Sequence, residues 1–224
     1  MLGETDAQPR RSRMTWTRLA LVTALALVAT SCADLKVQVQ YAPDAKIERL
    51  PAGVPVTVFR FADARGDEGD KGDSYRVGGV YGGYGNRLSK VLATSPWPTT
   101  LTHAVSDGLK ARGMEVVSVE DRTLDPAALT VSTPLALGGE IRNFSTESRW
   151  TRSAHVSGIL RLYTQSGRLV LERSISARAT EHELGTGVFT SVEPLEALMN
   201  QALSEFVRKV VMDPDLSQNL VAAH

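Results

Sequence analysis

The side chains that could do acid–base or metal chemistry are spread thinly along this sequence. None of the four histidines pairs with another at the spacing of metal ligands; they are His103, His155, His182 and His224. His103 falls beside the apolar face of an expected helix, where a half-buried structural role is the usual one. His182 lies between two glutamates, and we interpret it as a solvated strand end rather than a loose metal site.

A run of acidic residues, Asp67, Glu68, Asp70 and Asp73, invites comparison with a calcium-binding loop. An EF-hand loop places its ligands at alternate positions, with a glycine at the sixth position and a glutamate at the twelfth. The acids here do not keep that spacing, and the nearby Lys71 offsets part of their charge. We therefore predict a solvated loop and no metal site.

Motifs of the common hydrolases and nucleotide-binding proteins are missing. The sequence holds no Gly-x-Ser-x-Gly, no His-Glu-x-x-His and no phosphate-binding loop. We expect no catalytic residues, no cofactor and no enzymatic activity. A hydrolase is kept only as a distant third hypothesis, because a scattered active site leaves no motif.

Two tyrosines, Tyr81 and Tyr84, stand among glycines in the stretch VYGGYG (80–85). Tyrosine offers a large contact area and loses little conformational entropy on binding, so tyrosines in Gly-rich tips often contact partners. We interpret Tyr81 and Tyr84 as a candidate interaction loop. The alternative is a mobile insertion with no binding role.

The single cysteine, Cys32, has the clearest chemical assignment. One cysteine allows no intramolecular disulfide and excludes a four-cysteine zinc site. Cys32 follows an apolar run at 19–31, which is itself preceded by four arginines, Arg10, Arg11, Arg13 and Arg18. This is the layout of a secretory signal, and the run is shorter than the roughly 20 residues that span a bilayer.

The small residues Ala29, Thr30 and Ser31 directly before Cys32 resemble the lipobox of bacterial lipoproteins. The resemblance implies signal cleavage between Ser31 and Cys32 and attachment of lipid, such as palmitate, to Cys32. The alternative is an ordinary secretory signal with a chance cysteine. Met14 would begin a compact signal, so the true start is either Met1 or Met14.

The residue after Cys32 bears on the membrane in which the lipid would sit. An aspartate there tends to hold lipoproteins in the inner membrane of Gram-negative bacteria, but this sequence has Ala33. We therefore expect the periplasmic face of the outer membrane, with the inner membrane as the alternative.

Net charge is zero, from 25 basic and 25 acidic residues among 224, which gives no reason to expect nucleic acid as a partner.

The elements that must position these residues follow from hydrophobic periodicity. Alternating and continuous apolar runs predict strands, and apolar residues at three- and four-residue spacing predict helices. The expected strands are 35–41, 54–63, 114–119, 135–148, 153–164 and 168–182, and the expected helices are 98–112 and 194–211. Eight glycines within 64–96 make a compact element there unexpected.

This order predicts an α+β two-layer sandwich, with one mixed sheet of about four to five strands and two main helices on one face. The stripe of apolar residues along 194–211, which includes Phe206, should pack on the sheet as core. The expected organisation along the chain is a signal peptide at 1–31, a lipidated tether and lead-in strand at 32–53, a domain at 54–212 with a Gly-rich insertion at 64–96, and a short tail at 213–224.

Three segments carry a resemblance to a family: VPVTVFRFADARGDEG (54–69), LKARGMEV (109–116) and GEIRNF (139–144). They resemble small envelope lipoproteins of the YajG-like type, within the wider group that has a TolB N-terminal-like fold. Related lipoproteins include PqiC-like and LptE-like auxiliary components of lipid transport. The resemblance implies a non-enzymatic adaptor or accessory factor with envelope proteins as partners; the alternative is a periplasmic module that binds a lipid or small ligand.

Overall fold

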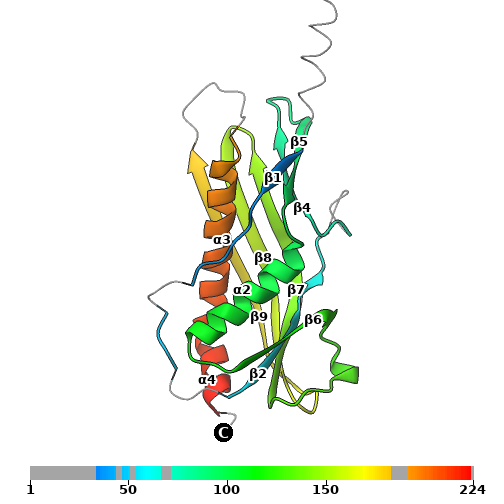
Figure 1. Cartoon of the computed structure of the whole chain (residues 1–224), viewed down its shortest axis with the longest axis vertical. Coiled ribbons are helices and arrows are strands. Elements are labelled where there is room, and N and C mark those ends of the chain that lie inside the picture. The colour runs from blue at the N-terminus through cyan, green and yellow to red at the C-terminus, as the bar shows by residue number, and fades with distance from the viewer. Residues whose placement is uncertain (1–33, 44–46, 51–53, 67–71, 183–190, 223–224) are drawn as a thin grey trace, which may run out of the picture. The chain divides into compact units, whose positions relative to one another are not determined.

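The computed structural model describes residues 34–43, 47–50, 54–66, 72–182 and 191–222 (Figure 1). Residues 34–224 form one compact unit. The compact unit therefore extends on both sides beyond the expected domain at 54–212. Its architecture is α+β, with helices packed on a curled, open, mixed sheet.

Three long antiparallel strands form the largest part of the sheet. They are β7 (Leu135–Ser148), β8 (Thr151–Thr164) and β9 (Leu169–His182), each 14 residues long. Leu137 lies opposite Leu162, which in turn lies opposite Leu171, so the apolar residues of all three strands share one face. The prediction of strands at 135–148, 153–164 and 168–182 is confirmed, because apolar residues recur along these segments on one buried face.

The other edge of β7 receives three short parallel strands in series. They are β2 (Val56–Arg60), β3 (Ala62–Asp63) and β4 (Arg76–Tyr81). Further strands pair outward from these: β6 (Val116–Thr123) with β2, β5 (Arg87–Ala93) with β4, and β1 (Leu35–Val37) with β5. The sheet of the described residues thus has nine strands.

The expected sandwich had too few strands, four to five, and its sheet was expected to be flatter than the observed one. A strand as long as β7 can pair with several short strands along one edge, so the sheet widens into two branches and curls. One branch carries β2 and β6, and the other carries β4, β5 and β1.

The Gly-rich segment 64–96, where no compact element was expected, contains the β4–β5 hairpin. That expectation was wrong because a glycine within a strand was interpreted as a loop signal. Gly78 has a φ of 146°, and a Cβ there would overlap the carbonyl oxygen of Thr146 on β7. Only glycine lets β4 approach β7 this closely.

Three α-helices lie within the described residues: α2 (Trp97–Ala111), α3 (Glu193–Val211) and α4 (Pro214–Ala222). The predicted helices 98–112 and 194–211 are confirmed to within a residue or two. The segment expected as a short tail forms α4, in which Leu216 and Leu220 are completely buried. Three helices therefore replace the two that were expected.

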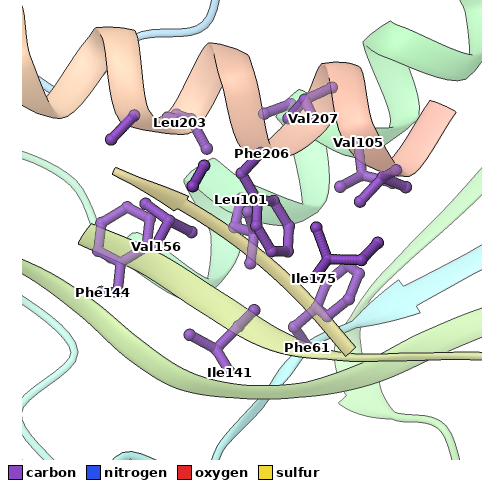
Figure 2. Close-up of a cluster of buried hydrophobic side chains, with 14 of the residues drawn as sticks. Phe61, Leu101, Val105, Ile141, Phe144, Val156, Ile175, Leu203, Phe206 and Val207 are labelled. Atoms are coloured by element: carbon purple, nitrogen blue, oxygen red, sulfur yellow. The ribbon is translucent and has the colours of Figure 1, made fainter. Parts of the chain in front are cut away.

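The core lies between α3 and the long strands (Figure 2). Leu203 and Phe206 of α3 point toward the sheet, which contributes Phe144 and Val156, and Val207 faces Gly108 of α2. Phe206 is 2% exposed, which confirms that the apolar stripe of this helix is core. Burying each such side chain contributes about 1.5–3 kcal/mol, so α3 holds the curled sheet together.

The residues after β1 are bound to α3. The backbone N–H of Gln38 donates to Glu196 Oε2 at 2.8 Å, and that of Gln40 donates to Asn200 Oδ1 at 2.8 Å. Residues 38–41, which we call the strap, thus follow the polar side of α3. The described part of the segment expected as a tether is therefore built into the domain.

Candidate functional site

The predicted lipidation and cleavage residues, Cys32 and Ser31, lie outside the described residues. The structure does define where the chain enters the sheet. Leu35 pairs in parallel with Val91, and Val37 pairs with Ala93. The amino end of β1 therefore faces the same end of the sheet as the start of β5.

Two turns lie side by side at this end of the molecule. Val80 of β4 pairs with Ser148 of β7, so the turn at 82–86 and the turn at 149–150 both begin directly beyond that pair. A Cβ on Gly83 would lie 3.4 Å from the ring of Trp150, which shows that the two turns are in contact. Both lie at the top of Figure 1, opposite the C-terminus.

Aromatic and cationic side chains gather on these two turns. We call them the tip cluster: Tyr81, Tyr84, Arg87, Arg149 and Trp150. The Arg149 guanidinium lies 4.5 Å from the centre of the Tyr81 ring and that of Arg87 lies 5.7 Å from it. The Arg87 Nη2 also donates to the Tyr81 hydroxyl at 3.4 Å.

The two predicted tyrosines have different roles in this cluster. Tyr81 ends β4, and its ring supports the two arginines. Tyr84 projects from the turn and is fully exposed, while Trp150 is 78% exposed. Large aromatic rings in water lose favourable burial, so an exposed pair on adjoining turns makes these turns a candidate contact surface.

Three members of the cluster, Arg87, Arg149 and Trp150, were not predicted from the sequence. A signal for Trp150 was present: it lies between two long strand patterns, where turns usually carry glycine, asparagine or aspartate. Its proximity to Tyr84 could not be inferred, because it depends on β4 pairing with the far end of β7.

A second arginine–aromatic group is buried at the start of α2. Arg65 is 5% exposed and lies 4.6 Å from the centre of the Trp97 ring, which stacks on Phe144. The guanidinium of Arg65 donates to both carboxylate oxygens of Asp63 at 3.0 Å and to the carbonyl oxygens of Asp73 and Arg76. These bonds fix the crossing from β3 to β4, which is a structural task.

The histidines of the described residues lie apart from one another. His103 Nε2 lies 2.6 Å from Glu120 Oε1, and His155 Nε2 lies 3.0 Å from the Ser176 hydroxyl. Burial, helped by the positive charge of Arg178, lowers the pKa of His155 below its ordinary value. No group of three potential metal ligands occurs within the described ranges.

Two surface hollows flank the strap at Tyr41. The larger, of about 480 Å³, is lined by Tyr41, Ile47, Arg178 and residues of α3 that include Arg208 and Lys209. The smaller, of about 430 Å³, lies on the α2 side and reaches His103 and Asp107. Glu205 accepts two hydrogen bonds from Arg208, which lower the pKa of its carboxyl, and Lys209 donates to the Ser176 carbonyl.

Comparison with known proteins defines first the class of fold: an α+β domain with a curled, open, mixed sheet. A solved protein from Xanthomonas campestris, assigned to the family model DUF330, has this fold with a TM-score of 0.57 and 15% sequence identity. The match covers 86% of this chain and 100% of that one. At that identity the likeness shows a shared fold alone.

Two weaker matches have TM-scores too low to define a shared fold. An uncharacterized protein reaches 0.47 at 15% identity, over 78% of this chain and 97% of its own. Lipoprotein GNA1162 from Neisseria meningitidis reaches 0.31 at 12% identity, over 70% and 97%. No protein-family model matches the sequence, and no curated protein matches it either. The comparisons therefore show the fold shared with the DUF330 protein and do not single out the YajG-like group.

Proposed function

We propose that this chain is a non-enzymatic lipoprotein of the bacterial cell envelope, anchored by lipid on Cys32. The observation that carries the proposal is the position of the only cysteine, directly after a secretory apolar run and three small residues. The fold shared with the DUF330 protein is consistent with it. In the part of the chain that the structure describes, no helix combines the length and hydropathy that crossing a membrane requires.

Replacing the acylated residue tests the anchor. Cys32→Ser should abolish incorporation of labelled palmitate and move the protein from the membrane pellet to the soluble periplasmic fraction. Ser31→Ala is the matched control, since it keeps a small residue before the cysteine and should leave both properties unchanged. Palmitate label on the Cys32→Ser variant, together with membrane retention, would contradict the proposal.

We place the lipoprotein on the periplasmic face of the outer membrane, because Ala33 and not aspartate follows Cys32. Ala33→Asp should therefore shift the protein toward the inner-membrane band of a density gradient. A wild-type protein already in the inner-membrane band would contradict this placement and leave the lipid anchor intact.

Within the envelope we propose the role of an adaptor or accessory factor for envelope maintenance or transport, with envelope proteins as partners. The resemblance to auxiliary lipoproteins of lipid transport supports this role, and it requires no catalysis. Crosslinking in intact cells should recover one envelope protein in every repeat with the wild type. The same experiment with Cys32→Ser should not recover that protein. Recovery of no protein from either would count against the adaptor role.

The larger hollow beside Tyr41 favours a second candidate, a module that binds a lipid headgroup or another small anionic ligand. Its volume of about 480 Å³ suits a small molecule, and Arg178, Arg208 and Lys209 line it. Native mass spectrometry of the Cys32→Ser protein tests this. A bound molecule that is lost in Arg178→Gln supports it, and a spectrum of the bare chain excludes it.

A further inference from the structure

The tip cluster presents two unlike chemistries on one small surface. Tyr84 and Trp150 expose aromatic rings on adjoining turns, and Arg87 and Arg149 lie over the Tyr81 ring just behind them. Amphipathic aromatic rings concentrate at the headgroup level of membranes, where one side of the ring meets lipid and the other meets water. Arginine next to such rings can pair with lipid phosphate.

Chain length ties this surface to the proposed anchor. Leu35 lies three positions after Cys32, and a fully extended chain of that length spans at most about 10 Å. Leu35 pairs with Val91, four residues along β5 from Arg87, which corresponds to about 13 Å of strand. Because β1 and β5 are parallel, the amino end of β1 and the start of β5 lie at the same end of the sheet, which is the end that carries the tip cluster.

The short connection limits how far the domain can stand from its membrane. A long tether would let the turns stay in water, but about 10 Å of chain cannot carry the anchor past the end of the β4–β5 hairpin. The same end of the sheet would then be held at the bilayer surface with Tyr84 and Trp150 outermost.

Charge at this end decides the kind of surface. Arg152 pairs with Glu181 at 3.6 Å, and Glu147 is exposed on the strand that ends at the tip. The cations are therefore offset in part, so the aromatic rings rather than a strong positive field would supply most of the contact. A bilayer interface fits this composition without requiring anionic lipid.

We propose that the tip cluster is a membrane-contact surface, with Tyr84 and Trp150 inserted at the headgroup level of the bilayer that holds the Cys32 lipid. This inference rests on the proposed lipid anchor. It assigns the two turns a task separate from any protein partner, which would meet the strap, the helices or the open sheet edges. The domain would stand with α4 and the β8–β9 turn pointing away from the membrane.

Tryptophan fluorescence tests the proposal, because the mature chain would keep two tryptophans, Trp97 and Trp150. Trp97 is completely buried and Trp150 is exposed, so only Trp150 can meet lipid. The acylated protein is reconstituted in phosphatidylcholine vesicles with or without bromine on the acyl chains near the headgroup. Brominated vesicles should lower the Trp150 emission, taken as wild type minus Trp150→Phe, by about two-fold or more, as expected for a ring at the headgroup level.

A matched control moves the reporter to the opposite end of the same strands. Leu169 is exposed at the start of β9, so the double variant Trp150→Phe, Leu169→Trp carries an exposed tryptophan far from the tip. Its emission should not respond to bromine. Equal quenching at both positions, or none at Trp150, would overturn the proposed membrane contact.

Mass spectrometry of the N-terminal peptide separates this proposal from the one on which it rests. An acylated Cys32 peptide without Trp150 quenching overturns the membrane-contact surface alone. A mature peptide without acyl groups overturns the lipid anchor and the contact surface together. Acylation with quenching confined to Trp150 supports both.

Discussion

Two groups of the same chemical kind, an arginine over an aromatic ring, lie in opposite settings in this molecule. Arg65 lies 4.6 Å from the ring of the completely buried Trp97, and Arg149 lies 4.5 Å from the ring of Tyr81 at the molecular surface. The distances are nearly equal. The difference is in what surrounds each pair, since Arg65 also donates to a carboxylate and two carbonyl oxygens.

Burial decides what each pair does. The Arg65 group stacks through Trp97 onto Phe144, so it connects β3, α2 and β7 and stabilises the core. The Arg149 group ends at water, beside the exposed ring of Trp150, and its loss leaves no cavity. The same interaction is therefore structural in one place and available for binding in the other.

The largest expected effect is at Trp97. Trp97→Ala removes a completely buried ring and its stack on Phe144, and should lower the free energy of unfolding by about 3–5 kcal/mol. Trp150→Ala is the control and should change it by no more than about 0.5 kcal/mol, as for other exposed positions. Urea unfolding of the Cys32→Ser background measures both, and equal losses would show that Trp150 is also part of the core.

The sequence predicts the core elements around the buried pair better than it predicts the surface that carries the exposed one. A repeated pattern marks a core element: 194–211 shows the 3.6-residue period of a helix, and 135–148 and 168–182 alternate as strands. Those elements form as expected because each buries one continuous face, as Phe206 and Phe144 show.

The tip cluster could not be predicted because it depends on contacts distant in sequence and on glycines with a packing role. Gly78 is a poor signal of a strand in the sequence, yet its lack of a side chain is what allows β4 to lie against β7. Without that pairing nothing brings Tyr84 to Trp150. The prediction of Tyr81 and Tyr84 as an interaction loop thus named two of the five residues of the tip cluster, and their role in binding stays a prediction.

A smaller effect is expected at Arg65. Arg65→Met keeps a side chain of similar length and removes the guanidinium donors to Asp63 and to the carbonyl oxygens of Asp73 and Arg76, while the backbone N–H of residue 65 still donates to Asp63. Because the Asp63 carboxylate keeps some access to water, the loss should be about 2–4 kcal/mol, below that of a fully buried ion pair.

The matched surface variant is Arg149→Met, which should cost no more than about 1 kcal/mol, the usual strength of an exposed cation–π pair. Thermal or urea unfolding of both variants gives the difference. An Arg149→Met variant as unstable as Arg65→Met would remove the distinction between a structural and an available pair.

The smallest expected effect sharpens the comparison, because it concerns a ring that can itself become charged. His155 on β8 lies opposite Arg178 on β9 and bonds the Ser176 hydroxyl. Burial, and then the positive charge of Arg178, holds the pKa of His155 below its ordinary value of 6.5.

The unfolded chain therefore binds a proton at His155 more readily than the folded chain does, so folding stability falls as the pH drops below 6.5 and is unaffected by this group well above it. His155→Gln should flatten the pH dependence of unfolding between pH 7.5 and 5.5, and Arg178→Gln should weaken it in part, because burial of His155 persists. Urea titrations at several pH values measure all three proteins, and identical slopes for wild type and His155→Gln would contradict the prediction.

Arginine stabilises the neutral rings of Trp97 and Tyr81 at every pH in this range, whereas beside His155 it opposes the charge that the ring acquires. The neighbour is the same in all three places, and the charge and burial of the ring set the sign and the size of its effect.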